Sequence, residues 1–357
     1  MKKQEITKSP RQSNMELLRI VSMIMIVMFH CNASLNVEPG TGNYVLARAL
    51  WIFGGLGDNL FVLISGYFST TSRFKWSKLI FLIVEVQFYQ WLATFIGCQL
   101  GVYELPVGRD LFLAFFPVIT GRWWFITAYI LLYIVSPYLR ILTDSLSDRH
   151  YRMLLLTVLT PFCFIPTVFG IFFGSTESFM YYSGCVWLII VYLLGGYIRR
   201  VQEQLKKSAL MLTLISIFII ALSMIIIDCY DAIYGDDLWI DPLYFRLQNN
   251  VVMVGLSMGI FGLFLHIRIP YNRAINIIAS TALGIYLLSE NRQLSEWIWF
   301  EALRVSDHST DPNLILYILG ATAVIFTVCV PIDLLRQKCQ TLLIRLIQYV
   351  RSKRVSA

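Results

Sequence analysis

The side chains best suited to chemistry lie in the first apolar stretch of the chain, MELLRIVSMIMIVMFHCNAS. Arg19 and His30 are eleven residues apart there, close to three helical turns, so both side chains fall on one helix face. Glu16, three residues before Arg19, joins this face and can hold the guanidinium in an ion pair. Ionisable groups cost roughly 2.5 to 3.5 kcal/mol each at the centre of a membrane helix. The stripe is therefore expected to face protein or a watery cavity and to form a site.

The imidazole is the side chain of this stripe that exchanges protons near neutral pH. At 1.5 Å per residue, His30 lies about 16 Å beyond Arg19, near mid-membrane if Arg19 is at the cytoplasmic surface. Two structural readings compete with a catalytic one. A membrane histidine can serve only as an interhelical hydrogen-bond donor, and an arginine can extend to the lipid headgroups. The face shared with Glu16 favours the functional reading.

The composition is that of a membrane protein rather than a soluble domain. Of the 357 residues, 57% are hydrophobic and 14% are charged, and the mean hydropathy is +0.66. The basic residues behind the net charge of +7 are spread between apolar segments, so we expect no nucleic-acid partner. The seven cysteines form no C-x-x-C pair and have no histidine at metal-ligand spacing, so we expect no metal site.

Ten apolar segments are long enough to cross a bilayer, which needs roughly 20 residues per helix. We expect an all-α fold in one domain, 1–357, with both termini in the cytoplasm. That orientation puts every lysine in an inner loop and most acidic residues in outer loops, as the positive-inside rule requires. The basic, amphipathic tail 335–357 is expected to lie on the cytoplasmic leaflet. The predicted spans are 15–35, 44–69, 79–100, 123–140, 153–174, 179–198, 209–227, 244–266, 274–291 and 313–334.

Motifs in most of these spans resemble the acyltransferase 3 family of integral membrane acyltransferases. Glu16, Arg19 and His30 match the family's first-span signature, and their spacing is the most specific element of the resemblance. GGLGDNLFVLISGYF (54–68) matches the second-span pattern. Later spans of the family are similar to WWFITAYILLYIVSPYL (123–139), VWLIIVYLLGGYIRR (186–200) and STALGIYLLSEN (280–291).

The chain departs from the family pattern at two positions. Many members carry an acid directly before the L-F of the second span, where this chain has Asn59, with Asp58 one residue earlier. Many also carry a histidine after the G-I-Y-L-L run, where this chain has Ser289 followed by Glu290. We therefore expect no second catalytic histidine at this position.

The resemblance implies transfer of an acyl group, usually acetyl, from a coenzyme A thioester to a hydroxyl of a glycan or another envelope molecule. Two roles for His30 fit that reaction and both stay open. The imidazole is either the general base that deprotonates the acceptor hydroxyl or a nucleophile that takes the acyl group and passes it on. The acyl-CoA donor is then a substrate, and no permanently bound cofactor is expected.

The binding residues are expected at both ends of a catalytic cavity inside the bundle. Arg19 is expected to act in catalysis together with His30 and to bind the donor. Three basic residues after the second span suit the donor phosphates or anchor the chain to the membrane: Arg73, Lys75 and Lys78. The candidates for acceptor binding, which otherwise hydrogen-bond neighbouring helices or belong to an interfacial belt, are Trp124, Tyr129, Asn249 and Glu290.

A flippase or transporter is the rival interpretation, in which the Glu16, Arg19 and His30 stripe binds a charged substrate or relays protons. The chain shows no internal repeat and no matched pair of broken helices, which many secondary transporters have. We therefore favour a membrane O-acyltransferase, and most of all an O-acetyltransferase. Its acceptor would be a cell-envelope polysaccharide or the lipid-linked precursor, and its location the plasma membrane of a bacterium.

Overall fold

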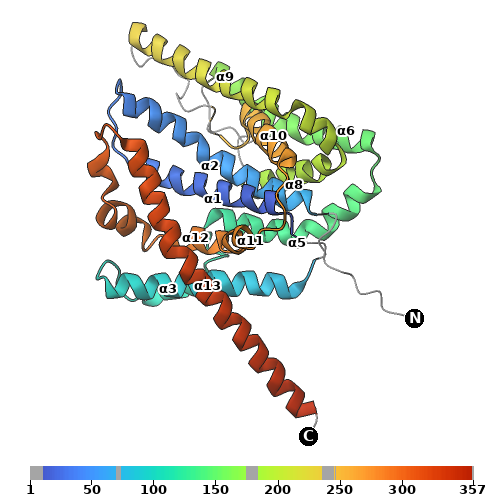
Figure 1. Ribbon diagram of the computed structural model, residues 1–357, viewed down its shortest axis with the longest axis vertical. Coiled ribbons are helices and arrows are strands. Elements are labelled where there is room, and N and C mark those ends of the chain that lie inside the picture. The colour runs from blue at the N-terminus through green and yellow to red at the C-terminus, as the bar shows by residue number, and fades with distance from the viewer. Residues whose placement is uncertain (1–10, 70–73, 174–183, 235–244, 246, 356–357) are drawn as a thin grey trace.

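The computed structural model describes residues 11–69, 74–173, 184–234, 245 and 247–355, and these residues form helices without any strand (Figure 1). The predicted all-α class is thereby confirmed. The helices are α1 (Ser13–Ala33), α2 (Gly42–Tyr67), α3 (Trp76–Gln99), α4 (Gly108–Phe115), α5 (Trp124–Ser145), α6 (Asp148–Leu159), η1 (Thr160–Phe164), α7 (Ile165–Phe173), α8 (Gly184–Arg200), α9 (Gln202–Tyr234), α10 (Val251–His266), α11 (Arg273–Ala279), α12 (Ala282–Ser289), η3 (Trp297–Ala302), η4 (Val305–His308) and α13 (Leu314–Val355).

Seven helices in the described part of the chain are long and apolar enough to cross a membrane. They are Ser13–Ala33, Gly42–Tyr67, Trp76–Gln99, Trp124–Ser145, Asp148–Phe169, Gln202–Tyr230 and Leu314–Val350, and each coincides with a predicted span. The other three predicted spans coincide with shorter helices: α8, α10, and the pair α11 and α12, which is interrupted at Ser280 and Thr281. The chain is a multi-pass membrane protein by its helix composition.

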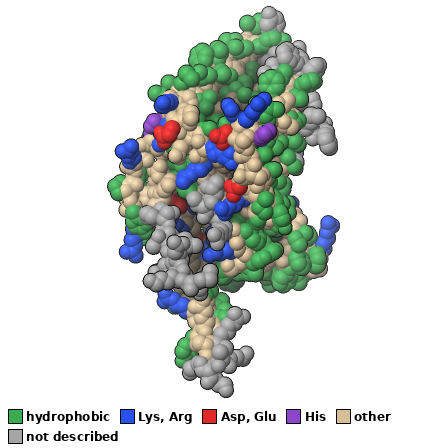
Figure 2. Space-filling view, turned by 90° about the vertical axis from the view of Figure 1, so that its right-hand side faces the viewer, with side chains coloured by type: hydrophobic (Ala, Val, Ile, Leu, Met, Phe, Trp, Pro, Cys, Tyr) green, Lys and Arg blue, Asp and Glu red, His purple; other side chains and the backbone are tan. Residues whose placement is uncertain are grey.

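Hydrogen bonds show which helix ends lie together. Tyr67 at the end of α2 donates to Gln202 at the start of α9 over 2.7 Å. At the opposite end of the bundle, Asn43 of α2 donates to the carbonyl oxygen of Ser309 over 2.9 Å. Figure 2 views the first of these ends, and Lys and Arg side chains are prominent on that face. The fold therefore puts basic loops at one end, as the alternation of loops in the sequence requires.

Helix α2 packs closely between α1 and α8 because glycines face both neighbours. A Cβ atom on Gly57 would lie 2.8 Å from the carbonyl oxygen of Ser22 in α1. On the other side, a Cβ atom on Gly66 would lie 2.1 Å from the carbonyl oxygen of Tyr192 in α8. Small residues at such crossings bring backbones into contact, which is a main source of helix association in membranes.

Helix α13 is held to α3 by a buried polar network. Asp333 is fully buried and accepts hydrogen bonds from Tyr89 Oη over 2.7 Å and from Arg336 Nε over 2.6 Å. Arg336 also donates to Glu85 of α3 over 2.8 Å. The predicted basic tail, 335–357, begins within this helix, which continues as one element to Val355. Attachment of the tail to the cytoplasmic leaflet stays a prediction.

Gly66→Ala is expected to destabilise the fold by about 1–3 kcal/mol, the usual cost of overpacking, because the new methyl group would overlap a backbone oxygen of α8. The midpoint of thermal unfolding in detergent measures the effect. Gly320→Ala in α13 is the matched control, since no atom lies within 4 Å of its added Cβ. Equal midpoints for the two variants would contradict the close crossing.

Candidate active site

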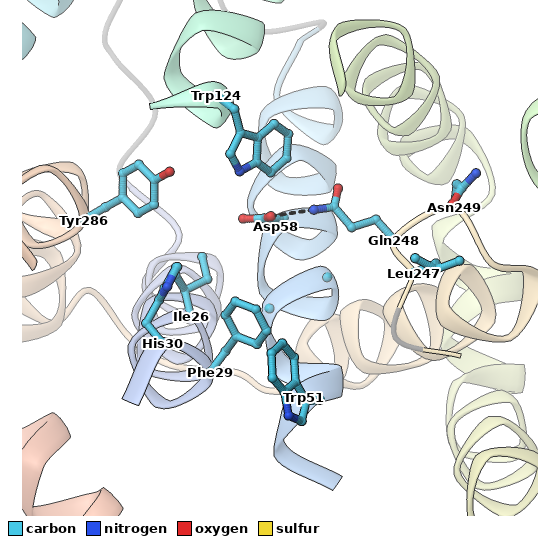
Figure 3. Close-up of a pocket in the computed structure, with 12 residues that line it drawn as sticks. Ile26, Phe29, His30, Trp51, Asp58, Trp124, Leu247, Gln248, Asn249 and Tyr286 are labelled. Carbon is cyan, nitrogen blue, oxygen red and sulfur yellow. Dashed lines mark hydrogen bonds between the residues drawn. The ribbon is translucent and has the colours of Figure 1, made fainter. Parts of the chain in front are cut away.

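His30, in the last turn of α1, lines a cavity of about 410 Å³ (Figure 3). The walls come from α1, α2, α12, the first residue of α5 and the loop that precedes α10. The described lining residues are Ile26, Phe29, His30, Trp51, Gly54, Gly55, Asp58, Trp124, Leu247, Gln248, Asn249 and Tyr286. Four of these residues are Phe, Trp or Tyr, and the walls also carry an imidazole, a carboxylate and two carboxamides.

The imidazole of His30 is held from one side by Glu290, the residue that follows α12. Nδ1 lies 2.8 Å from Glu290 Oε2, and the side chains are 31% and 10% exposed, respectively. The Phe29 ring meets the imidazole edge to face at 4.9 Å between centroids. When Nδ1–H donates to the carboxylate, the lone pair of the neutral ring is on Nε2. Within the described residues no hydrogen bond reaches Nε2, so this nitrogen is available to a ligand.

Asp58 and Gln248 form a second polar group in the cavity. Gln248 Nε2 donates to Asp58 Oδ2 over 2.7 Å, and Figure 3 shows this pair across the cavity from His30. The neighbouring Asn59 points elsewhere: it accepts from Trp187 Nε1 of α8 over 2.9 Å and donates to the backbone oxygen of Gln248 over 2.9 Å. Asn59 thus ties the loop before α10 to α2, and Asp58 faces the cavity.

Arg19 and Glu16 form the predicted ion pair, with 3.2 Å between Nη1 and Oε2. The guanidinium also lies over the Phe61 ring, 5.6 Å from its centroid. Its Nε is buried and has no hydrogen-bond partner among the described residues. Arg19 does not belong to the described lining of the His30 cavity. The predicted stripe is therefore divided between two locations along α1.

The remaining predicted residues separate into two groups. Trp124 and Asn249 line the cavity together with His30, and Glu290 meets the imidazole instead of facing the cavity as an acceptor ligand. Tyr129 lies outside the described lining, and its hydroxyl shares a hydrogen bond with Ser65 Oγ over 3.1 Å.

The basic residues between α2 and α3 contribute nothing to this cavity in the described structure. Lys75 and Lys78 are exposed at the start of α3. Arg73 lies outside the described residues. Their proposed contact with donor phosphates therefore stays a prediction.

Sequence analysis did not propose Trp51, Gln248 or Tyr286 as site residues, although helical spacing gave a signal for two of them. Trp51 precedes Asp58 by seven residues, and Tyr286 precedes Glu290 by four, spacings that put each pair on one helix face. Gln248 lies in a polar run directly before α10. Only tertiary packing brings that loop to α2.

A histidine backed by a carboxylate at the edge of a cavity is suited to proton transfer or nucleophilic attack. The model of the acyltransferase 3 family, an acyltransferase domain, matches residues 12–334. The chain belongs to this family. It is therefore a membrane acyltransferase, and the cavity that contains His30 is its candidate active site. No curated protein and no solved structure matches the chain.

Glu290→Gln is expected to change the tautomer of His30 in this acyltransferase. A carboxamide can donate its N–H to Nδ1, which then favours the proton on Nε2. Nitrogen NMR of histidine-labelled protein, with the His30 signals assigned by their loss in His30→Gln, measures the tautomer. The exposed Glu296→Gln is the control, and an unchanged tautomer in Glu290→Gln would contradict the pair.

Proposed function

We propose that this acyltransferase is an O-acetyltransferase, which moves acetyl from acetyl-CoA to a hydroxyl of a cell-envelope polysaccharide or its lipid-linked precursor. The observation that carries the proposal is the His30–Glu290 pair at the cavity wall, with 2.8 Å between Nδ1 and Oε2. The carboxylate orients the ring and stabilises the imidazolium that forms during the reaction, as in other carboxylate–histidine pairs.

As a general base, His30 Nε2 takes the proton of the acceptor hydroxyl while the oxygen attacks the thioester carbonyl carbon. The carbon–sulfur bond then breaks, and the imidazolium returns the proton to the leaving thiolate. Acetyl ester and free coenzyme A result. Glu290 stabilises the positive ring between the two proton transfers, and its burial strengthens this attraction.

As a nucleophile, Nε2 itself attacks the carbonyl carbon, and the thiolate leaves to give an acetyl-imidazolium. The acceptor oxygen then attacks the acetyl carbon, the carbon–Nε2 bond breaks to return the neutral ring, and the ester forms. The hydroxyl proton is released in this step and balances the proton that the coenzyme A thiolate takes up. Glu290 serves this route in the same way, by holding Nδ1. The two routes differ in one observable, since only the second leaves a labelled acetyl group on His30 after the donor is removed.

Arg19 supports a donor site on the basic side of the membrane. Its guanidinium keeps an unpartnered, buried Nε among the described residues, and Arg is well suited to phosphate or carbonyl oxygens. Our proposed topology has ten spans with both termini in the cytoplasm of a bacterial cell, and it turns the face in Figure 2 toward the coenzyme A pool. Lys75 and Lys78 are exposed at the start of α3, where they can reach the donor phosphates.

His30→Gln is expected to abolish release of coenzyme A from radiolabelled acetyl-CoA, and Glu290→Gln to slow it about 10²–10⁴-fold, since loss of the orienting carboxylate of a triad costs up to about 10⁴. The assay uses purified protein in nanodiscs. His308→Gln, in the loop far along the chain, is the control. Full turnover by His30→Gln would refute the catalytic assignment and favour the interpretation as a flippase or transporter.

Arg19→Ala is expected to raise the KM for acetyl-CoA about 10–100-fold, because a hydrogen bond to a charged group contributes roughly 1.5–3 kcal/mol. Initial rates over a donor concentration series measure it. Arg304→Ala, whose side chain is 71% exposed, is the matched control. A fall in kcat at constant KM would assign Arg19 to the reaction step instead of donor binding.

A further inference from the structure

We propose that Asp58 and Gln248 form an acceptor subsite, which holds a second hydroxyl of a polyhydroxylated acceptor while His30 acts on the first. This inference rests on the proposed function and adds to it the residues that position the acceptor. It assigns to Asp58 a binding role, distinct from the catalytic role of His30.

The carboxylate of Asp58 is arranged to accept a ligand hydrogen bond. The residue is 9% exposed and lines the cavity, so it is withdrawn from bulk water yet in reach of a ligand. Among the described residues, Gln248 alone hydrogen-bonds to it, through Oδ2. Figure 3 shows the other carboxylate oxygen turned away from Gln248, toward the side of the cavity where His30 and Tyr286 lie. Because Asp58 lines the cavity, a ligand hydroxyl in the cavity can donate to this oxygen.

Gln248 is fixed in place from outside the cavity. Asn59 Nδ2 donates to its backbone oxygen over 2.9 Å, and Asn59 itself is 1% exposed and bound to Trp187. Asn250, two residues on, caps α10 by accepting from the N–H of Val252 over 2.9 Å. Because these contacts determine the backbone of the loop, the carboxamide meets Asp58 without added entropic cost when a ligand binds.

The surrounding walls suit a sugar ring. Trp51 and Trp124 border the same cavity as Asp58, and Figure 3 shows them on two sides of it. Indole faces pack on the apolar C–H faces of pyranose rings, while a carboxylate and a carboxamide bind the hydroxyls at the ring edge. A carboxylate repels the phosphates of coenzyme A and cannot donate to a thioester carbonyl. The acceptor, rather than the donor, is therefore the ligand that fits this wall.

Asp58→Asn in the full-length protein tests the assignment with methyl glucoside, galactoside and mannoside as acceptors, together with their single-deoxy forms. The expected result is at least a tenfold rise in acceptor KM, which exceeds any loss of acetyl-CoA hydrolysis measured in the absence of acceptor. With the unmodified protein, one deoxy glycoside is expected to have a kcat/KM at least tenfold lower than its parent glycoside. Asp58→Asn is expected to remove this difference. Asp307→Asn, a half-exposed loop carboxylate, is the matched control.

Gln248→Ala provides a second, independent variant. Its acceptor KM is expected to rise. The rise in acceptor KM of the double variant is expected to be smaller than the product of the two single rises, since both residues act on one subsite. Equal losses of hydrolysis and transfer in Asp58→Asn would overturn the subsite, as would release of coenzyme A with acetylation of none of the glycosides. A wild-type protein that releases no coenzyme A would instead overturn the proposed function, and this inference with it.

Discussion

Hydrocarbon offers no hydrogen bonds, so polar side chains on spanning helices need partners inside the bundle. This constraint explains where the ionisable residues lie. Glu16 meets Arg19 on α1, and Arg336 of α13 meets Asp333 and Glu85. The network of α13 is closed, because protein groups occupy its acids and its guanidinium. The walls of the His30 cavity differ, since Nε2 and one oxygen of the carboxylate opposite are left for a ligand. Function is located where the pairing is incomplete.

Close packing of α1 on α2 is what gives that cavity its shape. A Cβ atom on Gly54 would lie 2.9 Å from the Phe29 ring, and that ring in turn meets His30 edge to face. Gly54 therefore lets Phe29 lie against α2 and support the imidazole from the side that Glu290 does not reach. A glycine of this helix crossing thus also helps to orient the imidazole of His30. The contact between α1 and α2 therefore contributes both to the stability of the fold and to the geometry of the cavity.

Much of this arrangement was predictable from local patterns. Apolar length located the helices, and the spacing of Glu16, Arg19 and His30 identified an ion pair and a histidine that lines the cavity. The partner of His30 was not predictable, because Glu290 follows it by 260 residues and only the packing of α12 brings the two together. Glu290 was expected to bind acceptor, and this role stays a prediction. The interruption between α11 and α12 at Ser280 and Thr281 was also not predicted, because the length of an apolar segment does not locate a local break within it.

Helical geometry explains the different surroundings of Asp58 and Asn59, the two neighbouring polar residues of the second span. Successive residues of a helix point about 100° apart, so the side chains of Asp58 and Asn59 leave α2 in different directions. Both reach Gln248, Asp58 through the carboxamide of that residue and Asn59 through its backbone oxygen. Asn59 faces α8 and the loop before α10, where its carboxamide both accepts from Trp187 and donates to a backbone oxygen. A carboxylate at position 59 could not donate and would leave that carbonyl unsatisfied. The acid at position 58 instead faces the cavity, opposite His30. The amide at position 59 therefore belongs to the packing of α2, and the acid at position 58 belongs to the cavity wall.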